Sequence, residues 1–164
     1  MSRSKKKIQP GDIFELKVSD SKFVCLQFIS DDPEMLGGDL VRFFKKTSSS
    51  PLSEDTIEEI INSGVHLYGF TYLGTGIKHK LYRYIANRNN ISLAEVDKLT
   101  FHSFTDSDLV NGELTSRYSI RKAGQGFREA TTNKENYDRL KESAWEDEVM
   151  FAEGFIALFK RQNI

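Results

Sequence analysis

Residues 10–46 read PGDIFELKVSDSKFVCLQFISDDPEMLGGDLVRFFKK, and this stretch decides the fold. It contains three apolar segments separated by polar residues, and we expect each segment to form a β-strand, at Asp12–Val18, Lys22–Ser30 and Asp39–Lys46. The short polar residues at 19–21 favour a turn, because their side chains can bond their own backbone. The middle segment is too apolar to leave one face in water. The stretch therefore predicts a three-stranded meander that is covered on both faces.

A helix is predicted directly after the meander, at Ser53–Ser63. Ser53 is a favourable N-cap residue, and Leu52 can pack against Ile57 as a hydrophobic staple. Acidic residues follow in the first turn, where they interact favourably with the helix dipole. Gly64 can adopt the left-handed conformation that ends a helix.

The rest of the chain alternates short strands with polar connections. We expect strands at Val65–Leu73, Ile77–Ala86, Leu99–Phe104 and Thr115–Lys122, a turn at 74–76, a loop at 106–112, one helical turn after Ser92 and a short helix at 133–142 capped by Asn133. The apolar residues of Val149–Phe159 fit a helix, although Val149–Phe151 alone would fit a strand that enters one.

These elements predict an α+β protein with a strongly bent, mostly antiparallel sheet that resembles a partly open barrel. Its helices are expected at about residues 53–63 and near the C-terminus. We expect residues 1–9 to be a flexible basic N-terminus and residues 10–164 to form a single domain.

The composition limits the classes of function. The chain has 164 residues with 23 basic and 24 acidic side chains, so its net charge is −1. Proteins that bind phosphate backbones usually carry a positive excess, which makes nucleic acid an unfavoured partner. No apolar run approaches the length of about 20 residues that spans a bilayer, and no secretory signal is evident. The single cysteine excludes an internal disulfide, and we expect a cytoplasmic protein.

The sequence does not predict a catalytic or metal site. Its histidines, His66, His79 and His102, do not share the spacing of metal ligands. Cys25 lies inside a continuous apolar segment, where a neutral thiol packs as a small hydrophobic group. We therefore expect no metal, no cofactor and no enzymatic reaction.

Two acidic groups are candidates for binding a protein partner. They are Asp31, Asp32 and Glu34 in a loop, and Trp145, Glu146, Asp147 and Glu148 near the C-terminus. Acidic side chains around an aromatic residue suit protein recognition, because the aromatic group contributes affinity and the charges influence the choice of partner and the association rate. Solvated loop charges are the simpler interpretation.

Two other functions remain open. A nucleic-acid-binding module would use the basic residues Arg3–Lys7, Lys78, Lys80, Arg83 and Arg88. A small hydrolase or nuclease would use His102, Asp106 and Asp108, provided that the fold brings them together in one pocket.

The chain also resembles the immunity protein 26 family of bacterial polymorphic toxin systems, over roughly residues 8–90. The similar positions are Pro10–Phe14, Lys22–Ser30, Asp31, Asp32, Leu36, Leu40–Phe44, Val65–Gly69, Gly74–Lys78 and Tyr82–Asn87. The resemblance implies a small cytoplasmic protein that binds and neutralises a cognate toxin and catalyses no reaction. Immunity proteins against nucleases are often strongly acidic, so the near-neutral charge leaves the class of toxin open.

The residues and the resemblance together lead to one hypothesis. The chain inhibits a toxin by occluding its active site, through a surface that includes Asp31, Asp32, Glu34 and neighbouring aromatic residues.

Overall fold

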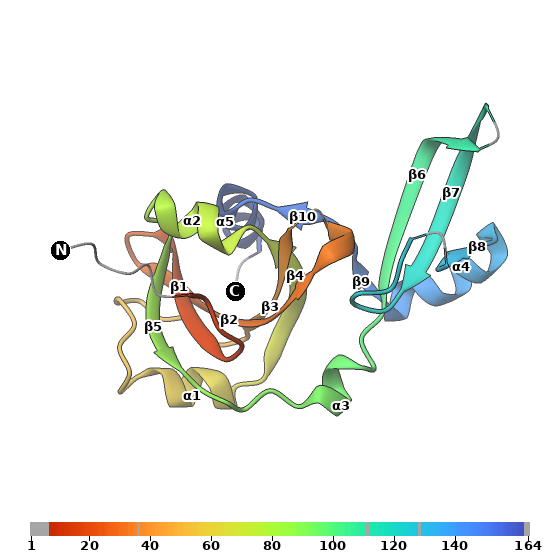
Figure 1. Ribbon diagram of the computed structural model, residues 1–164. Helices are drawn as coiled ribbons and strands as arrows, with labels where there is room; N and C mark the ends of the chain where they lie inside the picture. Colours follow the sequence, from red (N-terminus) through yellow and green to blue (C-terminus); the bar gives the residue numbers. More distant parts are fainter. Residues whose placement is uncertain (1–6, 36, 111, 128, 163–164) are drawn as a thin grey trace.

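The computed structural model describes residues 7–35, 37–110, 112–127 and 129–162, with the side chains of residues 106–110, 114 and 115 left aside. The described residues form an α+β fold with two mixed sheets (Figure 1). The first sheet contains β1 (Asp12–Ser19), β2 (Lys22–Asp32), β3 (Gly38–Phe44), β4 (Val65–Thr71), β5 (Tyr82–Asn87) and β10 (Val149–Met150). The second contains β6 (Phe101–Val110), β7 (Glu113–Arg121), β8 (Thr131–Thr132) and β9 (Trp145–Glu146).

The helices connect and cover these sheets. They are α1 (Ile57–Asn62), α2 (Leu73–Lys78), α3 (Leu93–Val96), α4 (Lys134–Leu140) and α5 (Ala152–Arg161), with short 3₁₀ turns at Pro33–Met35 and Lys141–Ser143. None of the described helices is long and apolar enough to cross a lipid bilayer.

The first sheet is the bent, mostly antiparallel sheet that the sequence predicts. Its strand order is β10-β4-β3-β2-β1-β5, and only the β10–β4 pair is parallel. The sheet curves strongly without closing into a barrel (Figure 1). The predicted α+β class and open, barrel-like curvature are therefore confirmed.

Both faces of the first sheet are covered, as the apolar sequence of β2 predicts. On one face, α5 places Phe155 and Phe159 against Phe43, with ring centroids 4.6 and 5.1 Å apart. On the other face, α1 packs over a separate apolar cluster that includes Phe44 and the fully buried Cys25. Alternate residues of each strand supply the two cores, because successive side chains point to opposite faces.

The first helix is shorter than predicted. Helix α1 begins at Ile57, whereas Ser53 belongs to the turn before it and its N–H donates to Oγ1 of Thr56 at 3.0 Å. The expected packing partners Leu52 and Ile57 are both buried in the same cluster. Gly64 has a φ of +87°, which confirms the predicted left-handed end.

The prediction of a turn at 74–76 between two strands is wrong, because this segment lies in α2. The carboxylate of Asp39 accepts a hydrogen bond from the N–H of Leu73 at 2.8 Å, which holds the first turn of the helix. Leu73 is fully buried and anchors the helix to the core. The predicted strand Ile77–Ala86 consequently begins only at Tyr82, as β5.

The second sheet was not predicted as a separate unit. The expected loop at 106–112 is wrong, since β6 continues to Val110 and pairs there with Glu113 of β7. The turn contains Gly112 at a φ of +83°, a conformation that favours glycine. The resulting hairpin projects away from the first sheet, with α4 alongside it (Figure 1).

The C-terminal segment combines both interpretations of its sequence. Val149 and Met150 form β10, and α5 follows at Ala152–Arg161, so the predicted C-terminal helix is confirmed. The expected capping by Asn133 is also confirmed, because its side chain accepts a hydrogen bond from the N–H of Asn136 at 2.8 Å.

Candidate functional site

The two adjacent acids at the end of β2 point to opposite faces of the first sheet. Asp31 is exposed, whereas Asp32 is completely buried on the face that the second sheet covers. This difference follows from the alternation of side chains along a strand. Oδ1 of Asp32 accepts a hydrogen bond from the N–H of Glu34 at 3.0 Å, and Glu34 itself is exposed.

A buried arginine brings the two predicted acidic groups together. Nη1 of Arg121 lies 2.8 Å from Oδ2 of Asp32, and Nε lies 2.5 Å from Oδ2 of Asp147. The side chains of all three residues are fully buried. The guanidinium group also packs over the rings of Phe70 and Phe127, at 5.5 and 4.7 Å from their centroids. Asp32 and Asp147 therefore fix the junction between the sheets and have no surface available to a partner.

The other members of the C-terminal group differ in exposure. Glu146 and Glu148 are exposed, whereas Trp145 is half-buried. The ring of Trp145 packs edge-on against Tyr68, with centroids 5.5 Å apart, in the core that joins the two sheets. Trp145 thus contributes to the junction and is not the exposed aromatic anchor that the sequence suggested.

Phe151 supplies an exposed aromatic group that sequence reasoning missed. It is 55% exposed, and its ring packs against Tyr72 at a centroid distance of 5.1 Å. Beside it is an open hollow of about 550 Å³, lined by Thr75, His79, Glu148, Val149, Met150, Phe151, Glu153 and Gly154. An aromatic side chain is therefore surrounded by two exposed acids on the surface formed by α2, β10 and the start of α5.

Asp31 and Asp39 form a carboxyl pair next to this surface. The two residues are direct cross-strand partners on β2 and β3. The pKa of Asp39 is raised to about 6, because burial and, to a lesser extent, the charge of Asp31 outweigh the lowering effect of the hydrogen bond from the Leu73 N–H. The start of α2 therefore depends on a carboxyl group that changes its protonation state near pH 6.

The hydrolase alternative requires His102, Asp106 and Asp108 to meet in one pocket, and the structure describes the side chain of His102 only. Nδ1 of His102 lies 3.2 Å from the hydroxyl of Tyr137, and its Nε2 lies 3.6 Å from Oε1 of Glu146. Asp106 and Asp108 belong to β6, but their side chains lie outside the described part of the structure. Within the described residues, no group of three or more histidine, cysteine, aspartate or glutamate side chains could hold a metal ion.

Several basic residues of the nucleic-acid alternative have acidic partners. Arg83 donates two hydrogen bonds to Glu15, at 2.9 and 2.8 Å, and Arg88 donates to Glu58 at 2.6 Å. Lys78 and Lys80 are exposed, at the end of α2 and in the turn that leads to β5, and neither belongs to the strand that the sequence predicted there. Arg3, Lys5 and Lys6 lie outside the described residues, and Lys7 is exposed.

No sequence signal pointed to either of the two missed residues, Phe151 and Arg121. Phe151 is four residues before the buried Phe155, so helical periodicity alone would place it on the same face; it is exposed because it precedes the first turn of α5 in an extended conformation. Arg121 gave no signal, because an arginine in an alternating strand normally faces water. Its burial depends on two acids from distant parts of the chain.

An α+β protein with acidic and aromatic side chains exposed beside a rigid sheet is suited to binding another protein. A comparison with models of protein families matches residues 9–109, more than half of the chain, to Immunity protein 26. The chain therefore belongs to the Immunity protein 26 family. Comparisons with the curated proteins and with the solved structures each found no significant match.

Proposed function

We propose that this immunity protein binds a cognate bacterial toxin and neutralises it by covering the toxin's active site. The family match over residues 9–109 carries the proposal. In this proposal the chain catalyses no reaction of its own and acts in the cytoplasm of the cell that it protects.

The contact region in this proposal is the acidic–aromatic surface, which we define as Asp31, Tyr72, Glu148, Phe151 and Glu153. Phe151 is the anchor, because an exposed ring that becomes buried on binding contributes a large apolar area. The exposed carboxylates around it attract a basic surface on the toxin and favour one orientation of the complex.

The other acids predicted from the sequence have different roles in the proposal. Glu34 and Glu146 are exposed and extend the negative potential beyond the acidic–aromatic surface. Asp32 and Asp147 act indirectly, since their ion pairs with Arg121 hold the segments that carry the exposed acids.

The nucleic-acid alternative is less well supported. Arg83 and Arg88 already form ion pairs with acids of the same chain, which reduces the charge that they offer to a phosphate. Affinity for DNA that falls steeply with salt would favour this alternative.

Co-expression of the cognate toxin with variants of this chain tests the proposal. Wild-type protein should restore growth, whereas the double variant Phe151→Ala with Glu148→Lys should fail to do so. The double change removes the anchor and reverses one charge, and neither side chain belongs to the core.

Glu135→Lys provides the matched control, because Glu135 is an exposed acid on α4, and that helix lies beside the second sheet, away from α2, β10 and α5 (Figure 1). This variant should protect cells as well as the wild type does. Wild-type protein that gives no protection would contradict inhibition of the toxin. Equal protection by the double variant would contradict the assigned surface.

A further inference from the structure

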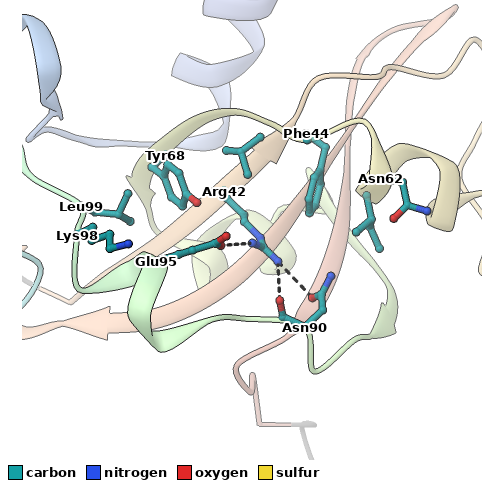
Figure 2. Close-up of a pocket in the computed structure, with 11 residues that line it drawn as sticks. Arg42, Phe44, Asn62, Tyr68, Asn90, Glu95, Lys98 and Leu99 are labelled. Atoms are coloured by element: carbon teal, nitrogen blue, oxygen red, sulfur yellow. Dashed lines mark hydrogen bonds and ion pairs between the residues drawn. The ribbon is translucent and has the colours of Figure 1, made fainter.

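A second hollow, of about 650 Å³, opens on the opposite side of the first sheet from α5. Figure 2 shows Arg42 at the centre of the lining residues, with Phe44, Tyr68, Asn90, Glu95 and Lys98 around it. We call it the Arg42 hollow. Its volume lies within the range of sites that bind small molecules.

The guanidinium group of Arg42 is held rigidly at one edge. Its Nε and Nη2 donate to Oε1 of Gln27, at 2.9 and 2.6 Å, and Nη2 also donates to Oδ1 of Asn90 at 3.2 Å. The amide of Gln27 is itself fixed, because its Nε2 donates to the carbonyl oxygens of Gly11 and Arg88 at 3.1 and 2.8 Å. The sheet therefore presents the remaining edge of Arg42, Nη1, in a defined direction.

Nη1 of Arg42 lacks a close anionic partner. Within the described part of the chain it makes no hydrogen bond, and the only carboxylate within ion-pair distance is that of Glu95, whose Oε2 lies 4.0 Å away. Arg42 is only 6% exposed. A buried cation normally has a close counter-charge, since removal from water disfavours the charged form.

Arg121 provides the internal comparison. Its side chain is fully buried, more completely than that of Arg42, and it has two buried carboxylates within 2.8 Å. The same chain thus neutralises one buried arginine completely and leaves the other facing an open hollow.

Glu95 is a weakly held occupant of the hollow. Its side chain is 64% exposed, and it belongs to the four-residue helix α3, which has no buried residues. Although Arg42 is buried, the 4.0 Å separation is too long for a hydrogen bond, so the pair lacks the close geometry of a stable ion pair. Glu95 therefore leaves Nη1 of Arg42 without a hydrogen-bonded counter-charge.

The rim adds positive charge to the hollow. Lys98 is one of the lining residues. Gly64 also lines the hollow, and the ammonium group of Lys45 lies beside it. Nζ of Lys45 is 3.9 Å from the position that a Cβ on Gly64 would occupy. Since Glu95 is the one acid among the lining residues, a bound anion would meet a net positive environment.

We propose that the Arg42 hollow binds a carboxylate-bearing ligand. The carboxylate replaces Glu95 at Nη1 of Arg42 and interacts with Lys98, while the rest of the ligand packs against Phe44 and Tyr68. The ligand is either a free small carboxylate or an acidic side chain of a protein partner. The proposal does not depend on inhibition of a toxin or on the acidic–aromatic surface.

NMR titration of the full chain tests this site through the backbone amides of residues 90–99. The probes are succinate, a short glutamate-containing peptide with blocked ends, and inorganic phosphate, each compared with sodium chloride at equal ionic strength. We expect both carboxylates to shift these amides saturably and more tightly than phosphate does. Tighter binding of succinate indicates a free ligand, and tighter binding of the peptide indicates a partner side chain.

Two exposed substitutions make the test specific. Glu95→Gln removes the internal competitor and should tighten carboxylate binding about two- to fivefold. Lys98→Gln should weaken it by a similar factor of about two to five. Glu135→Gln, the matched control on α4, should change nothing.

Arg42→Gln should abolish binding. If Arg42→Gln does not fold, the Glu95→Gln and Lys98→Gln variants still test the site. Amide shifts that match those in sodium chloride alone would overturn the proposal. So would tighter binding of phosphate, or an affinity that Glu95→Gln leaves unchanged.

Discussion

Asp147 receives two hydrogen bonds from the guanidinium group of Arg121, from Nε to Oδ2 at 2.5 Å and from Nη2 to Oδ1 at 2.8 Å. Asp32 accepts a third from Nη1, at 2.8 Å. These residues come from the end of β2, the end of β7 and the segment after β9. One buried ionic cluster therefore joins three segments that are far apart in the sequence.

Removal of the arginine should be strongly destabilising. Arg121→Met would leave two carboxylates buried without their counter-ion, and we expect the free energy of unfolding to fall by about 3–5 kcal/mol. Urea denaturation measures this change. The triple variant Arg121→Met, Asp32→Asn, Asp147→Asn removes the unpaired charges and should recover part of the loss. A loss below about 1 kcal/mol in the single variant would mean that the cluster is not a major link.

The two sheets should unfold together. The ion cluster and a shared apolar core, in which Phe70 packs against Phe101 at a centroid distance of 4.8 Å, both connect them. We propose that they form a single domain, so the fluorescence of Trp145, the only tryptophan, should change in the same urea transition as the far-ultraviolet circular dichroism. Two separate midpoints would show independent units.

Two glycines of α2 should respond oppositely to the same substitution. A Cβ on Gly76 would overlap the ring of Tyr82, whereas a Cβ on Gly74 has no neighbour within 4 Å. Gly76→Ala should therefore destabilise the fold by about 1–3 kcal/mol, and Gly74→Ala should be neutral or stabilise it by up to about 1 kcal/mol. Urea denaturation of the two variants provides the comparison. Equal effects would contradict the close approach of α2 to β5.

Asp39 should make stability depend on pH. Burial raises its pKa from 3.8 to about 6, so the folded state holds a proton that the unfolded chain releases. Its contribution to stability is complete below pH 3.8 and is lost as the pH rises through about 6. Because the group is partly exposed, we expect a change of about 1 kcal/mol.

Asp39→Asn is the variant that isolates this effect, because the amide oxygen can still accept the hydrogen bond from Leu73. As the pH rises from about 4 to about 6, the unfolding free energy of the wild type should fall relative to that of the variant, which has no carboxyl group at this position. Parallel pH profiles would show that Asp39 titrates normally in the folded state.

Sequence reasoning identified the first sheet because its signals are local. The apolar runs of β1, β2 and β3 fix their strands, and Gly64 fixes the end of α1. The same reasoning failed at α2, where Gly74 and Gly76 resemble a turn. The helix there depends on Asp39 and on the ring of Tyr82, which lie elsewhere in the sequence.

The candidate site was predicted only in part, for a similar reason. Sequence identified the acids, but their exposure depends on which face of a strand each one occupies. Asp31 and Asp32 are adjacent, but Asp31 is exposed and Asp32 is buried, because they point to opposite faces at the end of β2, where only the face of Asp32 is covered and carries Arg121. Trp145 was expected to be an exposed aromatic residue, but its ring packs against Tyr68 of the first sheet. Phe151, for which the sequence predicted no role, is the exposed ring.

The most direct measurement is the affinity of the purified cognate toxin for this chain, determined by isothermal titration calorimetry. If Phe151 anchors the complex, the double variant Phe151→Ala with Glu148→Lys should bind about 30-fold or more weakly than the wild type. Glu135→Lys should bind with wild-type affinity. Equal affinities for all three proteins would contradict binding through the acidic–aromatic surface.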